Sequence, residues 1–409
     1  MLEKKIDLKR DITLTLLVFY GLGNILGAGI YVLIGQIAGI SGMYIIFSFL
    51  LACIIIFFTA LTYAELSSRF PFSAGEALYA KEAFNSKSLS IIIGLIISLT
   101  GILSSATILH GFNGYISHFI ELSPYVTSTV VIIVLCIVCI LGIGHSVKVA
   151  SVFTLIEVFG LLYIIFIGFD KIPMDTVEIA TLIPPFEISA WYMISLGAFL
   201  AFYAFIGFED MVNVAEEVEN PTKNMPKAII IVLFVSTFLY ILVAFVSVIA
   251  IEPRMLAKST SPLADVYVKL ANEDPVLLSF IGMFAVINGA LIQIIMVSRV
   301  FYGMSMNKWI PNIFSKVNET TRTPVSATIF ASVSILIFTL WLPILTLANL
   351  TSFLIFIIFT LMNVALIKIK MQRQAPERII SYPLYIPIIG ILINVSMISI
   401  QFISLLTNI

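Results

Sequence analysis

The chain has 409 residues, of which 60% are hydrophobic and 11% are charged, with a formal net charge of −1 and a mean hydropathy of +1.11. Charged residues make up about a quarter of an ordinary soluble domain. This composition therefore excludes a soluble globular protein and indicates an integral membrane protein, for which we expect a lipid bilayer and no nucleic acid as partner.

Eleven apolar segments are long enough to cross a bilayer, which takes about 20 helical residues. They cover residues 12–39, 42–66, 89–117, 127–145, 149–169, 191–215, 227–251, 276–303, 324–342, 344–369 and 385–407. The first is too long, and is followed by too many others, to be a cleaved signal peptide. We predict an all-α integral membrane fold, with about 11 transmembrane helices in a single domain over residues 1–409 and a charged lead at residues 1–11.

Lysine and arginine are concentrated on one side of the predicted membrane, as expected for cytoplasmic loops. With the N-terminus in the cytoplasm, only four of the 22 basic residues fall outside: Lys171, Arg254, Lys258 and Lys269. We therefore predict a multi-pass protein of the cell membrane with a cytoplasmic N-terminus. The odd number of spans places the C-terminus outside.

The first span contains four glycines within nine residues, in the sequence GLGNILGAG at positions 21–29. Each glycine costs roughly 1 kcal/mol against alanine in a helix interior, and lipid offers no water to freed backbone groups. A break here is expected to face protein or a wet cavity. Amides near Gly27, Ala28 and Gly29 would then lie at a half-helix N-terminus that can hold a carboxylate. The alternative is a glycine-rich face for close helix packing.

Two connections between spans have distinctive sequences. Residues 69–84 mix charges and aromatic residues, which predicts an amphipathic interfacial helix, with a solvated loop as the alternative. After the sixth span, Pro221 and Pro226 are expected to stop the helix. The acidic residues at this end, Glu216, Glu217 and Glu219, are interpreted as a solvated face.

Four polar or reactive side chains within the apolar segments are interpreted as packing residues. Cys53, Cys136 and Cys139 lack further metal ligands nearby, so we expect small apolar core residues and no redox or zinc role. A lone histidine such as His110 is more often hydrogen-bonded in the core, although proton relays also use this residue type.

Glu157 is the only one of the 23 acidic residues that we place near the middle of a span, with apolar residues on either side. An ionisable group at that depth costs several kcal/mol and is by default a functional candidate. A low dielectric favours the neutral form of a carboxylic acid. We therefore predict a proton-coupling site at Glu157. The alternative is a protonated glutamic acid that only hydrogen-bonds a neighbouring helix.

The spans divide into two blocks of similar length, spans 1–5 at residues 12–169 and spans 6–10 at residues 191–370. Because five crossings is an odd number, a repeat between the blocks must be inverted. Span 6, like span 1, carries a helix-weakening segment at mid-depth. Interrupted helices in matching positions are a pointer to a transporter site at the midplane. We predict a five-plus-five inverted-repeat fold with spans 1 and 6 broken, and span 11 (385–407) outside the repeat.

Three motifs resemble those of the amino acid-polyamine-organocation (APC) superfamily. GNILGAGIY at residues 23–31 is similar to the first-span signature G-x-I-I-G-[SA]-G-I-F. FYAFIGFE at 202–209, with AEEVENP at 215–221 and Pro226, resembles the sixth span, and NGA at 288–290 with SRVFYGM at 298–304 resembles the eighth. The motifs cover most of the chain and are closest to the cationic and broad-specificity amino acid permeases.

The resemblance implies secondary transport of amino acids by alternating access. It implies that amides around Gly27, Ala28 and Gly29 hold the carboxylate of the substrate, while carbonyls around Tyr203, Ala204 and Ile206 meet its ammonium group. The substrate-binding positions that we carry over are Ile25, Gly27, Ala28, Gly29, Tyr203, Ala204, Phe205 and Ile206.

The chain departs from the family pattern in two places. Family members usually have twelve spans, one more than we count here. Proton-coupled members often carry a lysine in span 5, where this chain has Glu157. A carboxylate cannot imitate a cation, although it can take a proton or help to bind a metal ion. The coupling mechanism is therefore not inherited from the family.

We predict proton-coupled symport of amino acids, without a cofactor or a metal. The alternatives are exchange without ion coupling, polyamine transport and an amino acid sensor, although no loop is long enough for a soluble signalling module. A sodium symporter is disfavoured because residues 293–298 offer few hydroxyls to a hard cation. An enzyme is not expected, since we find no paired carboxylates, metal cluster or activated nucleophile at membrane depth. The sequence does not identify an accessory subunit.

Overall fold

The fold is known from a computed structural model, which describes residues 10–72, 75–117, 119–173, 175, 178–373 and 379–407. The predicted lead at residues 1–11 lies almost wholly outside these ranges. Within them the chain is helical, and the only β-pairing is an isolated bridge between Ile12 and Val218. The prediction of an all-α fold is confirmed for the described residues.

The helices follow one another with short connections. The α-helices are α1 (Leu14–Ile25), α2 (Ala28–Tyr31), α3 (Ile34–Ser41), α4 (Ile45–Arg69), α5 (Gly75–Phe84), α6 (Lys87–Ile116), α7 (Pro124–Ile140), α8 (Ile143–Lys171), α9 (Ile188–Tyr203), α10 (Pro221–Ala250), α11 (Pro253–Leu256), α12 (Pro262–Ala271), α13 (Val276–Met306), α14 (Val325–Trp341), α15 (Ile344–Gln372) and α16 (Tyr385–Thr407). The 3-10 helices are η1 (Gly42–Tyr44), η3 (Ile179–Leu182), η4 (Asp210–Glu217) and η5 (Asn312–Ser315).

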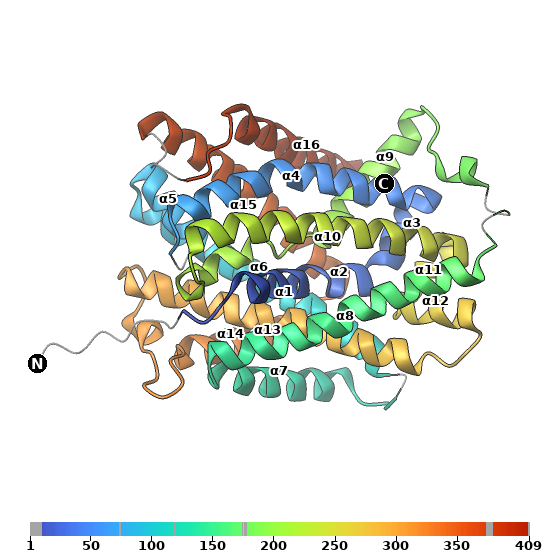
Figure 1. The fold of residues 1–409 in the computed structure, drawn as a ribbon, viewed down its shortest axis with the longest axis horizontal. Coiled ribbons are helices and arrows are strands. Elements are labelled where there is room, and N and C mark those ends of the chain that lie inside the picture. The colour runs from blue at the N-terminus through green and yellow to red at the C-terminus, as the bar shows by residue number, and fades with distance from the viewer. Residues whose placement is uncertain are drawn as a thin grey trace, which may run out of the picture.

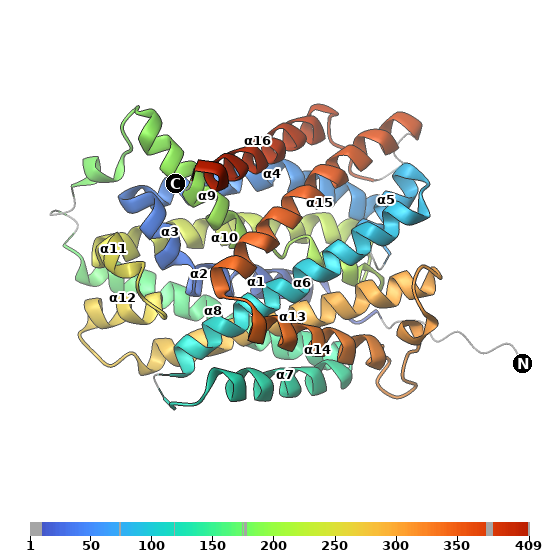
Figure 2. The same ribbon diagram turned by 180° about the vertical axis from the view of Figure 1, so that it is seen from behind.

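The long helices lie side by side along the longest axis of the molecule (Figure 1). Helix α5 lies at one end of this bundle, and α3, α11 and α12 lie at the other, as the view from behind also shows (Figure 2). Helix α13 packs against α6, α8 and α1. The interrupted first helix therefore lies in the interior of the bundle.

Eight helical stretches among the described residues are long and apolar enough to cross a membrane: Leu14–Tyr31, Ile34–Arg69, Lys87–Ile116, Val147–Lys171, Pro221–Ala250, Val276–Met306, Ile344–Gln372 and Tyr385–Ile403. Three shorter apolar helices, α7, α9 and α14, occupy three more of the predicted segments. Each of the predicted apolar segments thus contains a helix. The number of spans itself stays a prediction.

Helix α7 shows how the bundle separates its inner and outer surfaces. Val130, Ile133, Val134 and Ile137 recur at the spacing of one helix face, and each is more than half exposed. The opposite face places Leu135 and other residues in the buried core. An apolar stripe that faces away from the protein is suited to lipid.

The stretch after α4 is helical at residues 75–84, whereas residues 70–72 are not helical. In α5, Tyr79, Ala80 and Ala83 are buried, and the helix packs against α6 and α15. A helix within residues 69–84 is confirmed for residues 75–84, and its amphipathic, interfacial character stays a prediction. Glu76 is only 1% exposed, whereas an acidic residue on the polar face of an amphipathic surface helix would be exposed to solvent.

Pro226 does not stop a helix, contrary to the prediction. Helix α10 begins at Pro221 and continues through Pro226. A proline inside a helix removes the hydrogen bond to the carbonyl four residues earlier, which here belongs to Thr222. The hydroxyl of Ser68 donates to that carbonyl at 2.7 Å. A side chain of α4 therefore replaces the missing bond, and the helix continues.

Candidate functional site

The first candidate segment is the interruption between α1 and α2. Helix α1 ends at Ile25, α2 begins at Ala28, and only Leu26 and Gly27 lie between them. The amide of Leu26 still donates to the carbonyl of Leu22 at 2.7 Å, and that of Tyr31 donates to Gly27 at 3.3 Å. Helical hydrogen bonds therefore continue up to the amide of Leu26 and resume at the amide of Tyr31, with the interruption between them.

The second candidate segment lies between α9 and η4. Tyr203 ends α9, and the chain then makes consecutive tight turns, with the amides of Phe205 and Ile206 bonded to carbonyls three residues earlier. Gly207 has φ of +134°, a conformation that side chains disfavour. Its amide donates to the Glu209 carboxylate at 2.9 Å. The helical ladder is replaced here by turns and a side chain.

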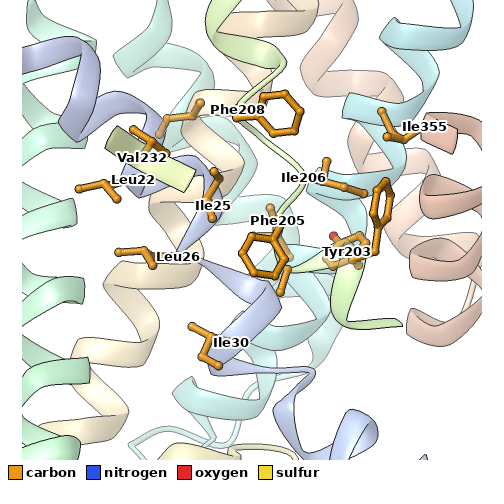
Figure 3. Close-up of a cluster of buried hydrophobic side chains, with 14 of the residues drawn as sticks. Leu22, Ile25, Leu26, Ile30, Tyr203, Phe205, Ile206, Phe208, Val232 and Ile355 are labelled. Atoms are coloured by element: carbon orange, nitrogen blue, oxygen red, sulfur yellow. The ribbon is translucent and has the colours of Figure 1, made fainter. Parts of the chain in front are cut away.

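The two segments meet in the interior. A Cβ added at Gly29 would collide with the backbone of Ala204, so the absence of a side chain at Gly29 permits the contact. The hydroxyl of Tyr240, on α10, lies between the carbonyl oxygens of Ile25 and Ala204, the latter at 2.7 Å. Apolar side chains of both segments, including Phe205, gather around this crossing (Figure 3). Glycine and tyrosine therefore hold the two interruptions together.

A polar cluster adjoins the crossing. The side-chain amide of Asn24 donates to the Gly207 carbonyl at 3.0 Å and to the Asp210 carboxylate at 2.7 Å. The amide of Gln293, on α13, donates to the same Asp210 oxygen at 2.5 Å. These bonds connect the end of α1, the start of η4 and α13. Glu209 and Asp210 are adjacent buried acidic residues within the sixth predicted span.

Glu157 lies in α8, and its side chain is fully buried. One carboxylate oxygen accepts a hydrogen bond from the side-chain amide of Asn288 on α13 at 2.9 Å, and the other has no partner among the described residues. Asn288 also donates to the Thr154 hydroxyl, which lies 3.0 Å from the carbonyl of Phe19 in α1. Glu157 therefore lies at a junction of three helices, separate from the polar cluster around Asp210.

The acidic end of the sixth span differs from the prediction at one position. Glu219 is exposed, as expected for a solvated face, but Glu217 is fully buried. The Glu217 carboxylate lies 3.4 Å from the guanidinium of Arg299, which is 1% exposed. Burying a carboxylate is costly unless it is paired, and η4 turns Glu217 towards α13, where the arginine supplies that pairing.

The remaining residues singled out from the sequence have packing roles. Ring nitrogen Nε2 of His110 donates to the carbonyl of Leu342 at 3.0 Å. The three cysteines are free thiols, and Cys139 is buried.

The predicted substrate-binding positions lie at or beside the crossing. Those that are buried there are Ile25, Gly27, Gly29, Tyr203, Ala204, Phe205 and Ile206. The backbone of Ala28 starts α2 there.

Five contributors to the site were missed in the sequence. Tyr240 gives no local signal, because one tyrosine in an apolar helix resembles any other. Asn24 and Gln293 are ordinary polar residues until the fold brings them to Asp210. Glu209 and Asp210 also lie within an apolar segment, but near its predicted end, so they did not meet the mid-span criterion that identified Glu157.

Comparison with known proteins identifies related sequences. A model of the amino acid permease family matches residues 12–407. Cationic amino acid transporter 3, mitochondrial, of Arabidopsis thaliana is 25% identical over 387 residues, which are 89% of this chain and 63% of that protein. The branched-chain amino acid permease BcaP of Bacillus subtilis (strain 168) is 28% identical over 402 residues, 92% of this chain and 84% of that one. The methylthioribose transporter of the same organism is 27% identical over 424 residues, 95% of this chain and 87% of that one.

The chain spans less than two thirds of the length of the plant transporter. Among solved structures, that of MhsT in complex with L-phenylalanine matches with a TM-score of 0.66. The match covers 97% of this chain and 99% of that one at 13% identity. A likeness at this identity concerns the fold alone, and it extends over nearly the whole of both chains.

Proposed function

Because the chain belongs to the amino acid permease family, we propose that it carries an amino acid across the cell membrane by alternating access, coupled to protons. Family membership confirms the predicted superfamily and a multi-pass membrane protein. It also confirms the prediction that the chain is not an enzyme, since its relatives are transporters and permeases. We propose the amino acid as substrate, alternating access as the mechanism and protons as the coupling ion.

The observation that supports this function best is the crossing of the two interruptions at Gly29 and Ala204, with Tyr240 between their carbonyls. A zwitterionic amino acid presents a carboxylate and an ammonium group close together. Amides around Gly27, Ala28 and Gly29 offer donors to the first, and carbonyls around Tyr203, Ala204 and Ile206 offer acceptors to the second. A carbonyl oxygen has two lone pairs, so the carbonyl bonded to Tyr240 keeps capacity for a ligand.

The arrangement of helices is consistent with two inverted repeats. In this proposal α1–α8 form the first repeat, α9–α15 form the second, and α16 lies outside both. Each repeat begins with an interrupted helix, and we place both interruptions at mid-membrane. Rocking of one part of the bundle against the other would open the crossing to each side in turn. We place the N-terminus in the cytoplasm, since the basic residues favour that side.

Proton coupling is assigned to Glu157. Its carboxyl group has one oxygen bonded to Asn288 and one without a partner among the described residues, so it can accept and release a proton there. Gain or loss of this proton at Glu157 alters the hydrogen bonding of Asn288, which also binds Thr154 next to α1. Protonation at α8 is thereby connected to the helix that carries the first interruption.

Uptake by purified protein in liposomes tests the proposal. A panel of labelled amino acids, with one polyamine and methylthioribose, is offered in sodium-free buffer with and without an inward proton gradient. For one-to-one symport, a gradient of about 1 pH unit supplies about 1.4 kcal/mol and drives roughly tenfold accumulation. Glu157→Gln is expected to lose this accumulation while it still exchanges internal for external substrate. Glu219→Gln, which changes an exposed carboxylate, is the matched control.

Other outcomes separate the alternatives. Uptake that ignores the gradient and requires an amino acid inside the liposomes identifies an exchanger. It would also reduce Glu157 to a structural hydrogen-bonding residue. Uptake of the polyamine or of methylthioribose alone rejects the amino acid as substrate.

A further inference from the structure

A second group of buried carboxyl groups lies beyond the substrate crossing. Glu209 and Asp210 end the second interruption, and Glu76 comes from α5, which packs against η4. Glu209 is 0% exposed, Asp210 is 3% exposed and Glu76 is 1% exposed. We name these three residues the acidic cluster. Among the described residues, no lysine or arginine forms an ion pair with any of them.

Neutral donors hold one oxygen of each carboxyl group. Asp210 accepts from the side-chain amides of Asn24 and Gln293, and Glu209 accepts from the amide of Gly207. Glu76 accepts from the side-chain amide of Asn213, at 3.2 Å. The cluster is therefore fixed in position without a neutralising charge.

Several polar atoms around the cluster are buried without a hydrogen-bond partner among the described residues. They are the second carboxyl oxygens of Glu76 and Glu209, the amide oxygen of Asn213 and the hydroxyl of Tyr63. Tyr63, on α4, interacts electrostatically with all three carboxyl groups. Buried polar atoms in proteins are nearly always bonded to protein or to ordered water. Their concentration here indicates a place where water and protons enter.

The charge balance of the cluster requires protons. Three carboxylates cannot all be ionised in a buried site that lacks cations, because desolvation and mutual repulsion both favour neutral forms. Glu76, which lies outside the spans, shows this directly: burial is the main cause that raises its pKa to about 8, and Asp210 contributes. Tyr63 and Tyr79 are the other titratable groups that interact with it, together with Glu209.

The basic residues of the helices packed on α5 are engaged elsewhere. On α15, Lys368 lies over the ring of Phe84 and Lys370 pairs with Glu65, while Arg373, directly after this helix, pairs with Glu82. Lys87, at the start of α6, is exposed. None of them therefore supplies a counter-charge to Glu76.

We propose that the acidic cluster, with Tyr63 and Asn213, is a proton relay between the α5 end of the bundle and the substrate crossing. This inference rests on the proposed proton-coupled transport. In each step one carboxyl O–H bond breaks and one O–H bond forms on a neighbouring carboxylate oxygen, directly or through water or the Tyr63 hydroxyl. Glu76 is the proton-binding group at the outer end of the relay, and it lies four residues from Phe72, which is 52% exposed. Asp210 is the proton-binding group at the inner end, and its hydrogen bond from Asn24 connects it to the crossing.

A metal cation fits the cluster less well than a proton. Hard cations require several free oxygen ligands around one point. One oxygen of Asp210 already receives two N–H donors, and the second interruption supplies no free hydroxyl. In the part of the chain that the structure describes, no group of three or more histidine, cysteine or acidic residues could hold a metal ion.

Gradient-driven uptake in liposomes tests the relay. Glu76→Gln keeps the size of the side chain and removes its proton exchange, so the gradient-driven rate is expected to fall roughly tenfold or more. Counterflow exchange of the substrate should stay within about twofold, because the crossing is untouched. Glu82→Gln, on the same helix but paired with Arg373 at the surface, is the matched control and should behave as wild type. Tyr63→Phe removes only an unpartnered hydroxyl and should slow the gradient-driven rate alone.

The outcomes distinguish this inference from the proposed function. Gradient-driven uptake by Glu76→Gln that equals wild type overturns the relay and leaves proton-coupled transport standing. A wild type that ignores the gradient overturns the coupling, and infrared titration then decides the relay. A protonated-carboxyl band that disappears with rising pH in wild type, and is missing in Glu76→Gln, supports proton exchange at Glu76. The same titrating band in both proteins overturns it.

Discussion

The two interruptions serve matching positions in the proposed repeats, but different chemistry holds them. Between α1 and α2 only two residues leave the helix, and Gly29 admits the backbone of Ala204. Between α9 and η4 the turns cover residues 204–209, and side chains of Glu209 and Asn24 bind the freed backbone of Gly207. The first interruption depends on missing side-chain volume, and the second depends on hydrogen bonds.

The difference follows from the length of each interruption. The first break places only two residues between its helices, and its main requirement is space for close packing of backbone against backbone. A longer break frees more backbone groups, which must find other partners where water is scarce. Added volume should therefore damage the first interruption most, and lost polar partners or backbone strain should damage the second.

The largest effect is expected for Gly29→Ala. Its new methyl group would overlap the backbone of Ala204, which cannot move aside as a flexible side chain does. A cost of about 3 kcal/mol corresponds to roughly 100-fold slower uptake. Gly27→Ala is the matched control, because its Cβ would lie 3.3 Å from the Ala285 carbonyl and needs only a small adjustment. Equal initial uptake rates for the two variants in liposomes would contradict a steric role for the first interruption.

Gly207→Ala tests the second interruption. Alanine is strained at φ of +134°, at a cost of about 1–3 kcal/mol, and its methyl group would meet the side chain of Asn24. We expect a lower unfolding temperature in detergent and slower uptake. Asn24→Ala should lower the unfolding temperature too, since it removes the side-chain donor to the Gly207 carbonyl and one of the two donors to Asp210. If both variants unfold at the wild-type temperature, polar bonding does not hold this segment.

Tyr240→Phe tests the connection between the two interruptions. The variant keeps the ring, which packs against Phe49 and Phe205, and removes the hydroxyl between two carbonyls. Loss of a buried hydrogen bond costs about 1–3 kcal/mol, so KM for the substrate is expected to rise about tenfold. Tyr125→Phe, at a position 63% exposed on α7, serves as the control. An unchanged KM in Tyr240→Phe would show that the crossing does not depend on this bridge.

The last prediction concerns pH, since the second interruption continues into a group of buried carboxyl groups that includes Glu76. The pKa of Glu76 is raised from 4.5 to about 8 in the folded protein. The unfolded chain therefore releases this proton first, and its contribution to stability falls as pH rises from 4.5 to 8. The slope is at most about 1.4 kcal/mol per pH unit. Glu76→Gln should flatten the dependence of the unfolding temperature on pH between these values, whereas an unchanged slope would assign it to other groups.

The sequence by itself determined where the helices lie. Each predicted apolar segment contains a helix, α1 ends within the glycine-rich stretch, and α9 ends at Tyr203 within FYAFIGFE. Hydropathy and glycine content are local properties, so they can be detected from short windows of sequence. The first motif was also sufficient, with two others, to identify the superfamily.

Only the tertiary structure decided which polar side chains are buried together. Asn24 meets Asp210 across 186 positions, and Glu217 is removed from solvent because Arg299 lies opposite. Pro226 continues a helix because Ser68 replaces its missing bond. A buried polar group is tolerated only when a partner compensates the loss of water. That partner comes from a distant segment, so neither the acidic cluster nor the bridge of Tyr240 can be recognised before the helices are packed.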